Sequence, residues 1–198
     1  MTDLGILGQN FSNMTTIKQE ILDLNARYSK SLVMNKQLST LPSKQTAILT
    51  CMDARLDPAV FSGFAVGEAH IIRNAGGRAS DDAIRSLVIS HKLMGTDQWF
   101  VIQHTDCGMM SITNEVMAYL LSESLETAIL DKEGWKNIRR EGGSEEGGKV
   151  DWLCIADPRK SIIEDVKRIR EHPLVSEKSS IFGFLYDVKS GLLEEISI

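Results

Sequence analysis

Cysteine is scarce in this sequence, with three residues among 198. An odd and small number of cysteines is a poor framework for disulfides, which are dense in small secreted domains. Residues 1–14, MTDLGILGQNFSNM, also lack the basic segment and the long apolar run of a secretory signal. We therefore expect a cytoplasmic protein with reduced thiols, whose cysteines are free to act as metal ligands.

The sequence has neither an excess of positive charge nor long hydrophobic runs. Its 22 basic side chains are outnumbered by 27 acidic ones, so it lacks the electrostatic footprint of a nucleic-acid-binding protein. No window approaches the roughly 18 consecutive apolar residues that indicate a membrane span. The expected partner is therefore a small molecule, with no nucleic acid and no membrane involved.

What remains is an ordinary globular composition, with 42% hydrophobic and 25% charged residues. Against a typical size of roughly 100–200 residues per domain, the length favours a single domain over residues 1–198. Apolar residues at helical spacing predict a helix over about 15–35. We assign residues 1–40 to an N-terminal helical arm of that domain.

Strands and helices are predicted to alternate along the rest of the chain. Short apolar runs predict strands at 46–51, 69–74 and 98–104, and two further strands in 179–198 are joined at a glycine turn. Helices are predicted at 81–94, near 109–124, and from a capping box at Ser161 and Glu164 to just before Pro173. This alternation predicts an α/β fold with a mostly parallel sheet flanked by helices and a C-terminal hairpin. The polar segment 131–150 is predicted to be a surface excursion.

Three residues of metal-binding type fall at predicted strand ends. Cys51 ends the first strand, His104 ends the third, and Cys107 follows three positions later. Ligands of parallel sheets bind outside the carboxyl ends of the strands. Two thiolates and an imidazole suit tetrahedral zinc, although each residue taken singly is more often a buried structural side chain. The residues alone leave both interpretations open.

Three motifs, CMDARLDP, IIRNAGG and HTDCGMM, resemble in their order and separation the signature of the β-class carbonic anhydrases. The resemblance is strongest to the small branch that carries CMDxR and HTDCG. It runs from about residue 44 to the end, because GFLYDVKSGLLEEI is similar to the closing hairpin of that family. The resemblance implies a β-carbonic anhydrase-like fold.

The resemblance also implies one Zn²⁺ per subunit, held by Cys51, His104 and Cys107, with Asp53 and Arg55 as the catalytic pair. Alternation along an extended chain sends Asp53 and Arg55 broadly the same way as Cys51. The planar fork of arginine can hold a carboxylate with two hydrogen bonds. Zinc-bound hydroxide would then hydrate carbon dioxide to bicarbonate, and Asp53 would occupy the fourth zinc position in a closed state.

Two other functions fit the same residues. Relatives in this branch hydrolyse carbonyl sulfide or carbon disulfide, so the enzyme is expected to be a lyase (carbonate dehydratase) or, as the alternative, a hydrolase that releases hydrogen sulfide and carbon dioxide. A non-catalytic zinc-binding protein is the lesser alternative. The resemblance further implies a homodimer or homotetramer, with Tyr28, Leu32 and Val33 as candidate contacts between subunits.

Overall fold

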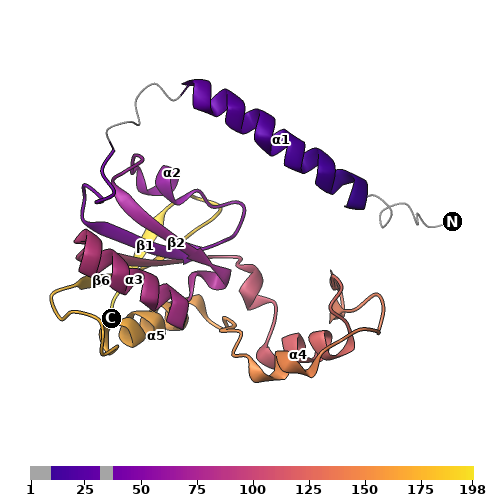
Figure 1. Ribbon diagram of the computed structural model, residues 1–198. Helices are drawn as coiled ribbons and strands as arrows, with labels where there is room; N and C mark the ends of the chain where they lie inside the picture. Colours follow the sequence, from indigo (N-terminus) through magenta and orange to yellow (C-terminus); the bar gives the residue numbers. More distant parts are fainter. Residues whose placement is uncertain (1–9, 32–37) are drawn as a thin grey trace. The chain divides into compact units, whose positions relative to one another are not determined.

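The computed structural model describes residues 10–31 and 38–198, with the side chains of 17–30 and 38–198. The chain divides into two compact units, residues 1–38 and 39–198. The first contains helix α1, Asn10–Ser31 (Figure 1). It begins before the predicted residue 15, whereas residues 32–35 of the predicted helix, with Leu32 and Val33, lie outside the described residues. The single domain with an arm over 1–40 stays a prediction.

The second unit is built on a five-stranded sheet of order β2-β1-β3-β6-β7. The strands are β1 Thr46–Cys51, β2 Ala69–Asn74, β3 Gln98–His104, β6 Ser180–Tyr186 and β7 Leu193–Ile196. Neighbouring strands from β2 to β6 are parallel, and only β7 runs antiparallel, against β6. The predicted α/β fold, including its C-terminal hairpin, is confirmed.

The core lies where two helices cover one face of this sheet. Helices α3, Asp81–Met94, and α5, Pro158–Arg170, both contribute buried residues to the main apolar cluster (Figure 1). The cluster joins them to alternate residues of the strands, such as Ala47 and Leu49 of β1 and Trp99 and Val101 of β3. Strand β1 is buried along its whole length because it is flanked by strands on both sides. Strands β1 and β3 each have a paired strand on both sides, so the sheet holds the residues at their ends in place.

The helix ends show which local signals were read correctly. Helix α3 has the predicted bounds 81–94, because Ser80 accepts a hydrogen bond from Ala83 N and Gly95 closes the helix with a φ of 74°. The capping box at the start of α5 is wrong, because the helix already begins at Pro158 with Asp157 as its N-cap. Proline at the first helical position is the stronger start signal, since its missing N–H costs nothing there. Within residues 10–31 and 38–198, no helix combines the length and the apolarity that crossing a membrane requires.

Residues 114–151 form a local excursion that closes on itself. The 3₁₀ turn η3, Gly108–Met110, precedes helix α4, Asn114–Glu123. The observed helix therefore starts five residues later than the predicted start near residue 109. The excursion continues through a short hairpin, β4 Ile129–Asp131 and β5 Gly134–Lys136, to the 3₁₀ helix η4, Glu145–Lys149, which packs against α4. Its two ends are clasped together, because the Asn114 side chain donates to Asp151 Oδ1 and accepts from Trp152 N.

Candidate metal centre

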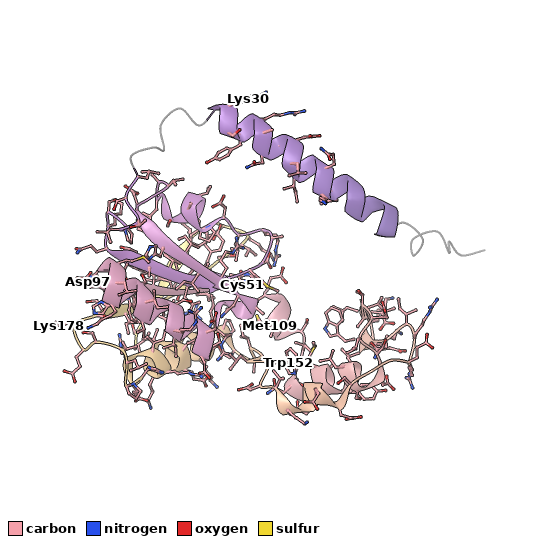
Figure 2. All side chains as sticks on the ribbon, in the orientation of Figure 1. Lys30, Cys51, Asp97, Met109, Trp152 and Lys178 are labelled. Carbon is pink, nitrogen blue, oxygen red and sulfur yellow. The ribbon has the colours of Figure 1, made fainter. Side chains whose placement is uncertain are left out.

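The three predicted ligands meet at the carboxyl ends of the two central strands. Cys51 is the last residue of β1 and His104 the last of β3, and these strands are parallel neighbours. The loop after β3 turns back to bring in Cys107, just before η3. Their ligand atoms all lie within 4.8 Å of one another, and all three residues are buried. Met109 packs against the small buried cluster that contains Cys51 and Cys107. Cys51 and Met109 both lie at this end of the sheet (Figure 2).

The spacing of the two sulfurs fits a shared metal ion. Cys51 Sγ and Cys107 Sγ are 3.9 Å apart, which is too far for a disulfide. Two sulfurs bound to one tetrahedral zinc at about 2.3 Å would stand about 3.8 Å apart. The backbone therefore already holds the sulfurs at the separation that zinc needs.

The imidazole of His104 is oriented to offer one nitrogen. Its Nδ1–H donates to the carbonyl oxygen of Thr105 at 2.9 Å, which fixes the neutral tautomer. Its Nε2 is buried and has no hydrogen-bond partner among the described residues. Leaving a buried nitrogen lone pair without a partner costs free energy. This nitrogen, beside two thiols, is therefore available as a metal ligand.

A hydrogen bond joins the two thiols. The hydrogen bond between them lowers the pKa of Cys51 and raises that of Cys107, and burial raises both. Backbone N–H groups of Asp53 and Gly76 also donate to Cys51 Sγ and stabilise its thiolate. Since metals bind thiolates, a divalent cation would displace any proton that these sulfurs carry.

The turn after β2 explains why glycines stand next to this site. In η2, Ala75–Gly77, both Gly76 and Gly77 have positive φ. A Cβ on Gly77 would come within 2.8 Å of Cys51 N, and one on Gly76 within 3.0 Å of Ile155 Cδ1. Only glycine lets this turn approach β1 closely enough for Gly76 N–H to reach the sulfur.

Asp53 and Arg55 form the predicted pair beside the ligands. Asp53 Oδ1 accepts from Arg55 N and Nε at 2.9 and 3.0 Å, and Oδ2 accepts from Nη2 at 2.8 Å. These bonds hold the pKa of Asp53 well below its usual range, so the carboxylate stays ionised. Its Oδ2 lies 3.8 Å from His104 Nε2. The carboxylate therefore borders the space that the three ligand atoms enclose.

Two further residues hold this loop and were missed as site residues. Arg55 also donates from Nη1 to Asp106 Oδ2 and from Nη2 to Asp106 O, so it bridges the two ligand loops. The sequence suggested no more than loop orientation for Asp106. Arg73 donates to the carbonyl oxygens of Cys51 and Asp53. Its place in IIRNAGG was visible, but no local pattern indicated that contact.

Other residues of metal-binding type lie outside the group of ligands. His70 pairs with Ser90 and His91 with Thr96, both on the α3 side of the sheet. Cys154 is half-buried, and burial raises the pKa of its thiol. None of these residues joins the metal-binding group.

The chain is similar to carbonic anhydrases in sequence and in structure. The family model described as carbonic anhydrase matches residues 46–193. The chain is 36% identical over 182 residues to β-carbonic anhydrase 1 of Mycobacterium tuberculosis, covering 92% of this chain and 99% of the relative. It is 28% identical over 183 residues to a carbon disulfide hydrolase of Acidianus sp., covering 89% of each chain. The solved carbonic anhydrase from Glaciozyma antarctica has a TM-score of 0.74 and 37% identity, over 88% of this chain and 95% of that one.

Proposed function

Since the chain belongs to the β-class carbonic anhydrase family and is an enzyme of it, we propose that it uses zinc to hydrate carbon dioxide reversibly to bicarbonate. The observation that carries this proposal is a three-donor metal site with an ionised carboxylate at its border. Structural zinc sites are closed by four strong ligands, whereas catalytic ones keep three protein ligands and an exchangeable position. Three donors and a carboxylate tied to arginine fit the catalytic type.

The residues divide the work of the reaction. Cys51, His104 and Cys107 would hold the ion, and Zn²⁺ bound there supplies a Lewis acid that makes hydroxide available from water near neutral pH. Water and carbon dioxide then give bicarbonate and one proton. Because Arg55 keeps Asp53 ionised, Asp53 Oδ2 is an acceptor that can orient the nucleophile's O–H and aim its lone pair at the carbon.

Asp53 has a second role in this proposal, as an exchangeable metal ligand. Its Oδ2 is 3.8 Å from His104 Nε2, somewhat longer than the roughly 3.4 Å between an oxygen and a nitrogen ligand of one tetrahedral zinc, so a small shift would bring it to the ion. Releasing Arg55 would free the carboxylate to close the site. Arg55 itself would stay anchored on Asp106 through two hydrogen bonds.

A second candidate is hydrolysis of carbonyl sulfide or carbon disulfide, favoured by the similarity to a carbon disulfide hydrolase. The same ligands serve both chemistries, because each begins with attack of hydroxide on an electrophilic carbon. The deciding experiment measures kcat/KM for carbon dioxide, carbonyl sulfide and carbon disulfide on one zinc-quantified preparation. Fast hydration with negligible sulfide release supports the first proposal, and the reverse result assigns the chain to the hydrolases.

Cysteine variants provide the matched control. Cys107→Ser should lose zinc and all turnover, whereas Cys154→Ser should keep both, since its thiol lies outside the metal-binding group. A zinc-loaded wild-type protein that turns over none of the three substrates would instead support a non-catalytic zinc protein.

We also propose that the protein assembles as a homodimer or homotetramer. Support comes from α1, on which Ile17, Ile21 and Leu24 recur at helical spacing with exposed side chains. Sedimentation velocity at micromolar concentration tests this. A monomer that keeps full activity would contradict it, and Ile21→Glu should weaken the assembly if α1 takes part.

A further inference from the structure

A buried ion pair lies behind the metal centre, between Arg78 and Asp165. Arg78 follows the glycine turn η2, and Asp165 lies within α5. Arg78 Nε donates to Asp165 Oδ2 at 2.8 Å and Nη2 to Oδ1 at 3.2 Å, with the two side chains only 9% and 3% exposed. Among the hydrogen bonds of the described residues, none joins either side chain directly to Cys51, His104 or Cys107.

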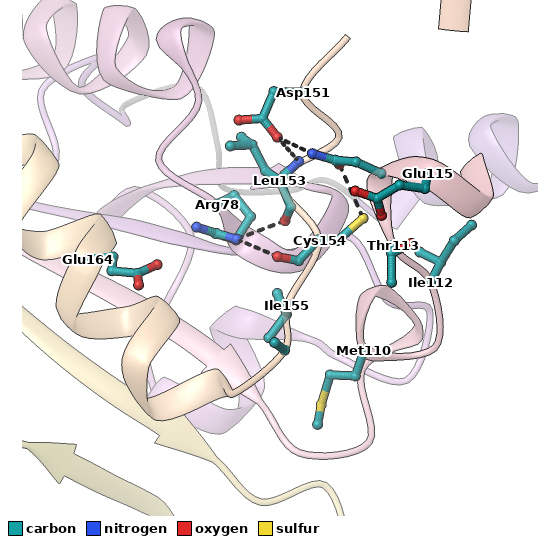
Figure 3. Close-up of a pocket in the computed structure, with 12 residues that line it drawn as sticks. Arg78, Met110, Ile112, Thr113, Glu115, Asp151, Leu153, Cys154, Ile155 and Glu164 are labelled. Carbon is teal, nitrogen blue, oxygen red and sulfur yellow. Dashed lines mark hydrogen bonds between the residues drawn. The ribbon is translucent and has the colours of Figure 1, made fainter. Parts of the chain in front are cut away.

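The side of the Arg78 guanidinium that does not face Asp165 binds a segment without regular secondary structure. Its Nη1 donates to the carbonyl oxygens of Leu153 and Cys154, at 2.8 and 3.1 Å (Figure 3). Leu153 has a φ of 52°, a left-handed conformation that a non-glycine residue adopts only when its surroundings impose it. These residues and Ile155 line a cavity of about 560 Å³, so packing alone does not fix the segment. Hydrogen bonds hold it: Arg78 binds its carbonyl oxygens, and Leu153 N donates to Asp151 Oδ1.

This segment leads directly to the metal ligands. Ile155 is buried in the same cluster as Cys51 and Cys107, and its N–H donates to the carbonyl oxygen of Met109. The N–H of Met109 in turn donates to Cys107 Sγ. A shift of the segment would therefore be felt at one of the two sulfurs.

Two other paths join the pair to the remaining ligands. Gln103 Nε2 donates to Asp165 Oδ2 at 2.9 Å, and Gln103 immediately precedes His104 in β3. On the other side, Arg78 ends the turn whose Gly76 N–H reaches Cys51 Sγ. The ion pair thus stands at the junction of three short paths, one to each ligand.

We propose that Arg78 and Asp165 are positioning residues of the metal centre: Asp165 fixes the Arg78 guanidinium, and Arg78 holds the Leu153–Ile155 segment so that the three ligand atoms keep their mutual geometry. The inference rests on the proposed metal site and is independent of which substrate is used. Removal of groups that orient metal ligands weakens metal binding by roughly 10- to 100-fold.

Cobalt(II) titration tests this, because cobalt reports the ligand geometry through its visible and thiolate charge-transfer absorption. Two variants are compared with the wild-type protein. Arg78→Lys keeps the charge but lacks the planar fork that bridges Asp165 and the two carbonyls. The double variant Arg78→Met/Asp165→Leu replaces the pair with apolar side chains of similar volume, an exchange that buried ion pairs often tolerate.

Both variants should bind cobalt about tenfold more weakly and show altered absorption. The control is Ile169→Ala, a fully buried change in the same helix that faces the main apolar cluster and should lower stability without changing the spectrum. Wild-type affinity and spectrum in both variants would overturn the inference and leave the pair a purely stabilising element. If the double variant does not fold, Arg78→Lys alone decides between these outcomes. A wild-type protein that shows no thiolate charge-transfer band would instead refute the proposed metal site itself.

Discussion

Among the described residues, two arginine–aspartate pairs are joined through both Nε and Nη2 of the arginine, and these two pairs lie in opposite surroundings. In Arg55–Asp53 the side chains are 48% and 16% exposed, whereas in Arg78–Asp165 they are 9% and 3% exposed. An exposed pair contributes only about 0–1 kcal/mol, so its partners can separate and rejoin. Breaking a buried pair leaves an uncompensated charge and costs roughly 3–5 kcal/mol. The comparison teaches that an arginine–aspartate pair can separate and rejoin where water reaches it, whereas a buried pair holds its neighbours in a fixed geometry.

The largest effect is expected when the buried pair is broken. Arg78→Met should lower the free energy of unfolding by roughly 3–5 kcal/mol at neutral pH, because Asp165 loses its buried counter-ion and two carbonyl oxygens lose the Arg78 donor. Urea denaturation measures this. Arg85→Met, which breaks the exposed pair with Asp82, is the control and should stay within about 0.5 kcal/mol. A loss below about 1 kcal/mol for Arg78→Met would erase the contrast between the two pairs.

Breaking the exposed pair should affect turnover rather than stability. Asp53→Ala should lower kcat/KM for the substrate by about 100-fold, since the oriented acceptor beside the metal is lost. Its free energy of unfolding should change by less than about 1 kcal/mol. Stopped-flow hydration assays and denaturation on the same zinc-quantified sample measure both quantities. Full turnover in this variant would remove Asp53 from the mechanism.

A smaller loss is expected when the charge is kept and the fork removed. Arg55→Lys should lower kcat/KM by about tenfold, because an ammonium group cannot bind both Asp53 oxygens and Asp106 at once. Asp106→Asn removes one anchor of Arg55 and should cost less than Arg55→Lys in the same assay. If Asp106→Asn were the more damaging of the two, Asp106 rather than Asp53 would be the main partner of Arg55.

The smallest expected effect is a pH dependence of the stability that Arg78→Met loses, which tests the charge of the buried pair. Burial raises the pKa of Asp165 above its ordinary 3.8, and Arg78 lowers it in part. In Arg78→Met the lowering is lost, so the pKa rises further. A carboxyl with a raised pKa in the folded state stabilises that state below the unfolded value and loses this contribution as pH rises through the folded one.

The stability deficit of Arg78→Met should therefore grow as the pH rises above the ordinary range of a carboxyl group. Denaturation of the variant and the wild-type protein at several pH values from that range upward measures it. The deficit of Ile169→Ala, a substitution that removes no charge and breaks no ion pair, should stay constant and corrects for any pH-dependent loss of metal. A deficit of Arg78→Met that is equally constant would contradict the raised pKa.

The two pairs also differ in how far the sequence revealed them. Asp53 and Arg55 stand two positions apart in a motif, next to a cysteine at the end of an apolar strand, so the pattern is local. Arg78 and Asp165 are 87 positions apart, and each alone looks like one more charged residue. Only the packing of α5 against the sheet brings them together, and no periodicity in either segment specifies that contact.

In the fold, too, local patterns were predicted correctly and features that depend on tertiary packing were not. Strands β1 and β3 were predicted at their observed bounds, because a buried parallel strand is a short apolar run with clear ends. The start of α5 was misread, since the capping box at Ser161 competed with Asp157–Pro158 four residues earlier and the burial of Ser161 is a tertiary property. The start of α4 was placed too early because residues 109 and 110 belong to the 3₁₀ turn η3, whose hydrogen bonds span three residues and which ends before α4 begins.

The clasp at the base of the 114–151 excursion has an evolutionary consequence. Because Asn114 joins Asp151 and Trp152 directly, the chain between them can lengthen, shorten or be exchanged while its two ends stay in register. Lineages and protein engineers could thus vary this part of the molecule as an interchangeable cassette, leaving the metal-binding scaffold inherited intact.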